Sequence, residues 1–254
     1  MNLSIEIPED KEPVNISLDD ALCQVAEKRG ITSDNLYKIY YASEQKNIFF
    51  DENDIVNKSK RREFATYYDN KNLTTASCRF LYHSTDNEFT KIYVFSNDYK
   101  KNIVISKIIA EIYFQHYANE FSSYDKCGFF VPKIYNYGFV ENHGYEEYQV
   151  FYFTMENING ITINNIHSID KTHNRDHLKY IDLKYKAINI NKCLKCSGFF
   201  HNDLHSNNIM ISKKSDELFI IDYGESSKKE NNTNGFVDFQ YCIDYKNENV
   251  NYCL

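Results

Sequence analysis

The chain has 254 residues, of which 42% are hydrophobic and 26% are charged, and this balance predicts a soluble globular protein rather than a disordered one. Its net charge of −7 argues against a broad nucleic-acid or anionic-membrane surface, because phosphate binding needs clustered Lys and Arg. No stretch approaches the roughly 18 apolar residues of a membrane helix, and the first residues lack the features of a signal peptide. The seven cysteines are odd in number and irregularly spaced, which predicts reduced thiols in an intracellular protein.

The first predicted helix begins after Ser17. This residue can cap the first turn, and Asp20 can reach back to complete a capping box. The helix runs to about Arg29, where Gly30 occupies the position that commonly adopts a left-handed conformation.

Short strands are predicted on both sides of this helix, at residues 3–7, 36–41 and 47–50. The order strand, helix, strand, strand predicts a small N-terminal α/β module over residues 1–60, faintly similar to a ubiquitin-like roll. An extension packed on the main domain is the alternative. Residues 51–62 are highly charged and are interpreted as a linker.

The next part of the chain alternates strands and helices. Residues 78–83 and 89–95 are predicted to form paired strands joined by a turn at 84–87. An apolar face predicts a helix over residues 103–117. Two further strands, at 131–140 and 148–153, and a long helix at 176–197 ending at Gly198 complete the pattern.

A polar constellation follows the long helix. Residues 201–210 read His-Asn-Asp-Leu-His-Ser-Asn-Asn-Ile-Met, and residues 220–224 read Ile-Ile-Asp-Tyr-Gly. Asp203 could orient a hydroxyl group, whereas Asn208 and Asp222 offer the hard oxygen ligands that Mg²⁺ prefers. This set suits phosphoryl transfer, which depends mainly on positioning and on metal-bound phosphates.

The two segments resemble the catalytic loop (H-R-D-L-x-x-x-N) and the D-F-G motif of protein kinases. The resemblance implies that Asp203 orients the acceptor hydroxyl and that Asn208 and Asp222 hold Mg²⁺ or Mn²⁺. Lys91 would contact the phosphates of ATP, and Glu111, twenty residues later in the predicted helix, would form an ion pair with Lys91.

The resemblance also implies an α+β fold with two lobes, preceded by the N-terminal module. The kinase-like domain would span residues 63–254, with a small lobe at 63–155 and a shortened large lobe at 156–254. Glu156 would lie at the hinge that binds adenine, with Thr154 or Phe153 at the back of the pocket.

Three departures from the kinase pattern are evident. No glycine occurs between Gly30 and Gly128, so Ala76 and Ser77 would have to cover the phosphates in place of a glycine-rich loop. Asn202 replaces the Arg that commonly answers an activation-loop phosphate, which indicates activity not gated in that way. Few residues follow the second motif, and no A-P-E motif occurs among them.

We therefore expect an atypical serine/threonine protein kinase that uses ATP. A pseudokinase that serves as a binding module is one alternative, and a small-molecule kinase of the aminoglycoside or choline type is another. The expected partners are ATP, a protein substrate and an unknown partner of the N-terminal module, with no membrane or nucleic acid. The composition is typical of an AT-rich genome, and the predicted C-terminal lobe is short. In both respects the chain resembles kinases of large DNA viruses, which implies a virus-encoded protein in the host cytoplasm.

Overall fold

A five-stranded sheet forms the smaller lobe of the computed structural model, which describes residues 15–46, 77–97, 100–122, 127–141, 148–166 and 177–229. Its strands are β1 (Glu44–Lys46), β2 (Ser77–Thr85), β3 (Glu88–Ser96), β4 (Ile134–Val140) and β5 (Tyr148–Glu156), in the order β1-β4-β5-β3-β2. The β2–β3 hairpin and strands β4 and β5 are the elements that the sequence predicts. All neighbours pair antiparallel except β1, which runs parallel to β4.

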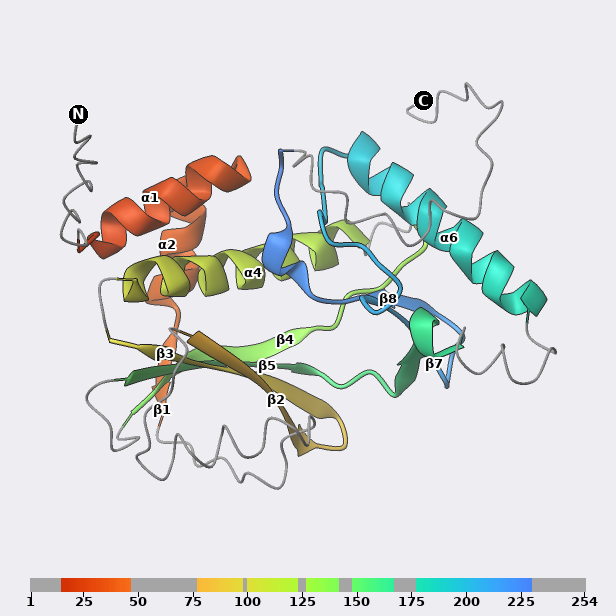
Figure 1. Ribbon diagram of the computed structural model, residues 1–254, viewed down its shortest axis with the longest axis horizontal. Helices are drawn as coiled ribbons and strands as arrows, with labels where there is room; N and C mark the ends of the chain where they lie inside the picture. The colour runs from red at the N-terminus through yellow and green to blue at the C-terminus, as the bar shows by residue number, and fades with distance from the viewer. Residues whose placement is uncertain are drawn as a thin grey trace, which may run out of the picture.

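Helix α4 (Lys101–Ser122) crosses one face of this sheet, with α1 (Leu18–Arg29) and α2 (Ser33–Tyr41) on its far side (Figure 1). Apolar side chains of α1, α2, α4, β3, β4 and β5 share one buried core. Ser17 is confirmed as the cap of α1, because its Oγ accepts a hydrogen bond from the backbone N–H of Asp20. The Asp20 carboxylate accepts from that same Oγ rather than from the backbone N–H of Ser17, so the predicted capping box is only half formed. Gly30 ends the helix with a φ of 70°, as predicted.

The strand predicted at residues 36–41 is wrong, because these residues belong to helix α2. Ile and Tyr have high strand propensity, but Thr32 provides an extended N-cap and Asp34 places an acid in the first turn. Leu36 is fully buried, and its packing stabilises the helix over a strand.

The described part of residues 1–60 lies against the kinase-like domain. Helices α1 and α2 contact α4, and β1 joins the sheet beside β4. Gly138 permits this approach, because a Cβ there would collide with the backbone of Glu44. The strands predicted at 3–7 and 47–50 and the linker at 51–62 lie outside the described residues, so the domain division stays a prediction.

The larger lobe contains α6 (His177–Cys196), a sheet of β6 (Gly160–Thr162), β7 (Ile209–Ser212) and β8 (Leu218–Ile220), and the short 3₁₀ helix η2 (Tyr223–Glu225). Leu183, Ala187, Ile190 and Leu194 of α6 pack in the core of this lobe. Tyr185 of the same helix is 52% exposed. The two lobes confirm the α+β kinase-like architecture.

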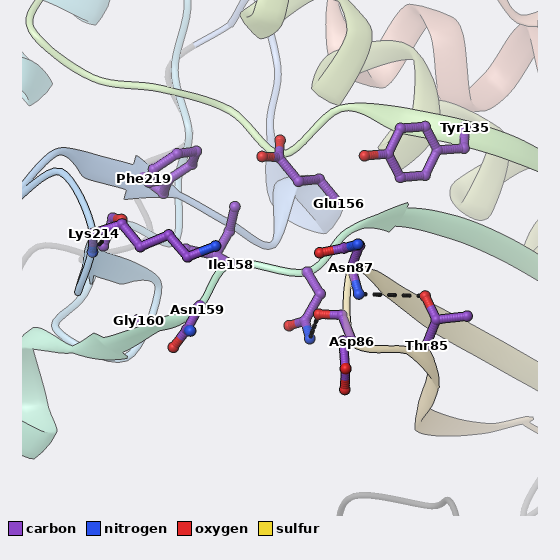
Figure 2. Close-up of a pocket in the computed structure, with 12 residues that line it drawn as sticks. Thr85, Asp86, Asn87, Tyr135, Glu156, Ile158, Asn159, Gly160, Lys214 and Phe219 are labelled. Atoms are coloured by element: carbon purple, nitrogen blue, oxygen red, sulfur yellow. Dashed lines mark hydrogen bonds between the residues drawn. The ribbon is translucent and has the colours of Figure 1, made fainter.

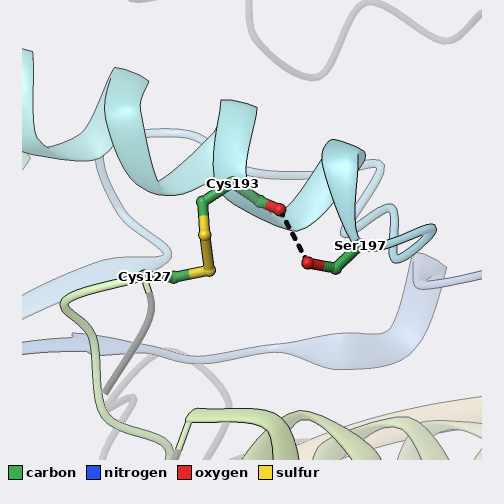
Figure 3. Close-up of a disulfide and its surroundings, with 3 residues drawn as sticks. All are labelled: Cys127, Cys193 and Ser197. Atoms are coloured by element: carbon green, nitrogen blue, oxygen red, sulfur yellow. Dashed lines mark hydrogen bonds between the residues drawn. A yellow bond between two sulfur atoms is a disulfide. The ribbon is translucent and has the colours of Figure 1, made fainter. Parts of the chain in front are cut away.

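A disulfide joins Cys127, just before β4, to Cys193 of α6 (Figure 3). The prediction of reduced thiols is wrong for this pair. Their separation of 66 residues carries no local pattern, and only the fold brings their Cα atoms to 5.6 Å. Among the helices of the described residues, none has the length and apolar character needed to cross a bilayer.

Candidate active site

Lys91 on β3 and Glu111 on α4 form a buried ion pair. Lys91 Nζ lies 2.5 Å from Glu111 Oε1, and the two residues are only 5% and 4% exposed. The hydroxyl of Tyr93 donates to Glu111 Oε2 at 2.7 Å. The ion pair predicted from the spacing of Lys91 and Glu111 is therefore present, with both carboxylate oxygens hydrogen-bonded.

Asp222 approaches the same lysine from the end of β8. Its Oδ1 lies 3.0 Å from Lys91 Nζ, so one ammonium group bridges two carboxylates from different lobes. The backbone N–H of Ile221 donates to the carbonyl of Asn208 at 3.0 Å, which fixes the strand end against the catalytic loop. Asp222 itself has a φ of 65°, a left-handed conformation that is uncommon outside glycine.

The predicted catalytic loop, residues 201–210, brings Asp203 and Asn208 together. The side-chain amide of Asn208 donates to the carbonyl oxygen of Asp203 at 2.9 Å and to its Oδ2 at 3.2 Å. These bonds use the amide hydrogens of Asn208 and leave its Oδ1 to accept or to bind a cation. The side chain of Asp203 is 41% exposed, and His205 Nε2 lies 3.7 Å from its Oδ1.

Burial shifts the protonation of two loop residues. His201 is 1% exposed, and desolvation lowers its pKa to about 4 despite the opposing hydrogen bond to Ile221. It is therefore neutral at pH 7 and donates from Nε2 to the carbonyl of Ile221 at 3.1 Å. Desolvation also raises the pKa of Asp203, with His205 opposing and Asp222 reinforcing the shift.

A cleft of about 430 Å³ lies beside these groups, a volume typical of small-molecule sites. Lys91, Asn208 and Asp222 line it, together with the segment from Glu156 to Ile158. Apolar side chains provide most of the remaining wall: Leu81, Phe89, Pro132, Met155, Met210 and Ile221.

The residues predicted for the back of the nucleotide pocket, Phe153 and Thr154, are not among the described residues that line the cleft. Met155 lines the cleft, whereas Phe153 is buried in the small-lobe core and Thr154 Oγ1 pairs with Thr90 Oγ1 at 2.9 Å. Residues 150–155 are all buried, so alternation along this strand could not show which side chain faces the cleft.

The remaining predicted nucleotide contacts have different outcomes. Glu156 lines the cleft, but its backbone N–H already donates to the carbonyl of Lys133 at 2.8 Å. Ser77 begins β2 and Ala76 lies outside the described residues, so the contact of both with the phosphates stays a prediction.

A larger, more open groove of about 1210 Å³ shares Glu156, Asn157, Ile158 and Gly160 with the cleft (Figure 2). Its other walls include the β2–β3 turn, Tyr135, Lys214 and Phe219. None of Lys91, Asp203, Asn208 and Asp222 lines this groove, so the smaller cleft is the candidate active site.

The donor set limits the kind of metal that the site could hold. The described residues contain no group of three or more His, Cys, Asp or Glu side chains arranged to bind a metal ion. Asn208 and Asp222 offer two oxygen donors beside the cleft, which suits Mg²⁺ because it is commonly bound by one or two protein ligands plus substrate phosphates.

Two contacts of this site are absent from the sequence prediction. Tyr93 could have been found, because side chains two apart on a strand share a face and Tyr93 follows Lys91 at that spacing. Asn202 has a φ of 62°, which Asn tolerates better than Arg, and its amide donates to the carbonyl of Glu225 at 3.0 Å and to Ser227 Oγ at 2.8 Å.

Two solved structures share a weak similarity with this chain. Among solved structures, the bifunctional kinase-methyltransferase WbdD is similar, with 18% identity, a TM-score of 0.36 and coverage of 60% of this chain and 30% of that chain. A complex of WbdD with the kinase inhibitor LY294002 gives 19% identity, a TM-score of 0.34 and coverage of 59% and 31%. The chain thus spans about a third of these structures, and likeness at this level carries no functional argument.

No curated protein matches the chain significantly. The family model of the ABC1 atypical kinase-like domain matches residues 109–245, just over half of the chain. This range includes Glu111, Asp203, Asn208 and Asp222 but begins after Lys91. The chain therefore belongs to the ABC1 atypical kinase-like domain family.

Proposed function

We propose that this protein is an ATP- and Mg²⁺-dependent phosphotransferase that acts as a serine/threonine protein kinase. The observation that carries the proposal is the simultaneous contact of Lys91 with Glu111 and Asp222, at 2.5 and 3.0 Å. Protein kinases need both the lysine–glutamate pair and the metal-binding aspartate in place for transfer. A protein that retained only the fold would have no need for this arrangement.

The cleft is suited to ATP. Its apolar walls can enclose a flat base, while Lys91, Asn208 and Asp222 can face a triphosphate. In the part of the chain that the structure describes, the backbone N–H of Ile158 makes no hydrogen bond, and we assign it, rather than that of Glu156, to the edge of adenine. Bound ATP with Mg²⁺ would supply the transferable phosphoryl group and neutralise its developing charge.

The residues around this group have separate roles in the proposal. Lys91, fixed by Glu111, holds the phosphates, and the oxygens of Asn208 and Asp222 hold the metal ion. Asp203 orients the acceptor hydroxyl and accepts its proton. The partial exposure of Asp203 supports a protein acceptor, because its carboxylate can meet a hydroxyl presented from outside the cleft.

The test is transfer of labelled γ-phosphate from ATP, with Mg²⁺ or Mn²⁺, to a generic protein such as casein. Asp203→Ala should lower the rate by about 10²- to 10⁴-fold, the usual contribution of a positioned base. Asp182→Ala, at an exposed position on α6 whose carboxylate pairs with Lys186, is the matched control and should retain the wild-type rate.

The other candidate functions appear as distinct results. Label on amino alcohols or aminoglycosides but not on casein would replace the protein acceptor with a small molecule. Equal rates for wild type and Asp203→Ala would overturn the role of Asp203. An absence of both label and nucleotide-dependent thermal stabilisation would identify a pseudokinase.

A further inference from the structure

The N-terminal helix reaches the segment that follows the metal-binding aspartate. Arg29, the last residue of α1, is 5% exposed and donates from Nη1 to the carbonyl of Ser226 at 2.9 Å. Its Nη2 donates to the carbonyl of Gly224 at 2.5 Å and lies 3.6 Å from the carboxylate of Glu225. One guanidinium group therefore binds three consecutive residues directly after Tyr223.

Further contacts continue this attachment along the chain. The backbone N–H of Lys228 donates to the carbonyl of Arg29 at 2.8 Å, and Lys229 Nζ donates to the carbonyl of Glu27 at 2.8 Å. Gly30 leaves room for this segment, because a Cβ there would lie 2.8 Å from Cγ of Lys229. The segment 224–229 is thus attached to the C-terminal end of α1 by hydrogen bonds from both backbone and side-chain groups.

The opposite side of the same segment is bonded to the catalytic loop. Phe200 and Ser227 exchange two backbone hydrogen bonds, at 2.9 and 2.8 Å. Asn202 adds its amide bonds to Glu225 and Ser227. The segment therefore lies between α1 and the catalytic loop and is held from both.

This double attachment bears on Asp222. Its left-handed φ of 65° is a strained conformation, which persists only where the surrounding structure enforces it. Ile221 on one side is bonded to Asn208, and Gly224 on the other is bonded to Arg29. Arg29 thus fixes the chain two residues beyond the carboxylate that faces Lys91.

We propose that Arg29 is a positioning residue, through which helix α1 holds the Asp222 loop in its metal-binding conformation. The inference rests on the proposed phosphotransfer, and it makes residues before the family match a working part of the site. Because an arginine of the same chain fixes this loop, the loop needs no phosphorylated residue to become ordered.

The experiment compares Arg29→Ala and Arg29→Lys with Lys28→Ala, a change at the exposed neighbouring position on α1. Residues that position metal ligands typically contribute 10- to 100-fold to metal affinity or activity. We expect the Mg²⁺ concentration for half-maximal transfer to rise by about that factor in Arg29→Ala. Arg29→Lys retains the charge and most of the packing but not the planar guanidinium that binds two carbonyls. This variant should therefore fold, and its half-maximal Mg²⁺ concentration should also rise. Lys28→Ala should match the wild type.

Hydrogen exchange of the peptide containing residues 222–229 provides a readout that needs no catalysis. Exchange should accelerate in both Arg29 variants and remain at the wild-type rate in Lys28→Ala. Wild-type exchange and wild-type Mg²⁺ dependence in both Arg29 variants would overturn the inference. If the wild type transfers no phosphate, the proposed function fails, and the exchange rates alone decide whether α1 holds this loop.

Discussion

Tyr93 and Glu111 are joined by a hydrogen bond of 2.7 Å that completes the coordination of the buried carboxylate. Lys91, two residues before Tyr93 on the same strand, contacts the other oxygen of Glu111. Because side chains alternate along a strand, both donors lie on the same face and meet one residue of α4. The helix is thereby fixed to the strand by two bonds rather than one.

The first prediction concerns Tyr93→Phe, which removes the hydroxyl and keeps the ring. A hydrogen bond to a charged acceptor contributes about 1.5–3 kcal/mol, so urea unfolding should show a loss of that size. The KM for ATP should also rise, because Glu111 then holds Lys91 less firmly. Tyr185→Phe, at an exposed position on α6, should change neither quantity. Unchanged stability and KM in Tyr93→Phe would show that the lysine alone fixes Glu111.

The second prediction concerns Lys91→Met. Removing one member of a buried ion pair lowers the free energy of unfolding by about 3–5 kcal/mol, because the remaining charge is buried without its partner. The double variant Lys91→Met with Glu111→Gln should be more stable than Lys91→Met alone, since it removes that charge. Lys107→Met changes an exposed lysine of α4 and should be neutral. If the double variant were less stable than the single one, the buried charge would not be the cause.

Local patterns in the sequence were sufficient for much of the fold. The β2–β3 hairpin, α4 and the catalytic loop follow from periodicity and turn residues, and the kinase resemblance then pairs Lys91 with Glu111. Each of these depends on short stretches or on spacing within a known arrangement. The site was predictable to this extent because its central residues lie in such stretches.

The remaining features depend on contacts between distant parts of the chain. Arg29 and Ser226 are separated by 197 residues, and nothing near either residue indicates that they meet. The sequence could not show that Met155, rather than Thr154, lines the cleft, because β5 is buried on both faces. Helix α2 was missed because packing on α4 outweighs the strand propensity of its aromatic residues.

The third prediction concerns acid stability and His201. Its pKa is about 4 in the folded protein and about 6.5 when unfolded, so the unfolded chain binds more protons between these values. Stability is therefore complete above pH 6.5 and is lost as the pH falls toward 4. From pH 7 to pH 5 the loss due to His201 should be about 2 kcal/mol.

Urea unfolding of wild type and His201→Gln at both pH values would measure this contribution. Gln retains a donor for the carbonyl of Ile221 but does not titrate. The variant should therefore lose about 2 kcal/mol less than the wild type between pH 7 and pH 5. An identical loss in both proteins would assign the acid sensitivity to other groups.

The last prediction concerns the disulfide between Cys127 and Cys193. A cross-link that closes a loop of this length stabilises by about 2–4 kcal/mol, mainly by restricting the unfolded chain. The double variant Cys127→Ser with Cys193→Ser should lose that amount in urea unfolding, whereas Cys23→Ser, which removes an exposed free thiol, should lose little. In wild-type protein unfolded without reductant, alkylation should label Cys23 and spare the bonded pair. Full labelling of Cys127 and Cys193 would show that the purified protein lacks this cross-link. The double substitution should then cost only the packing of the buried Cys127 thiol and the partly buried Cys193 thiol.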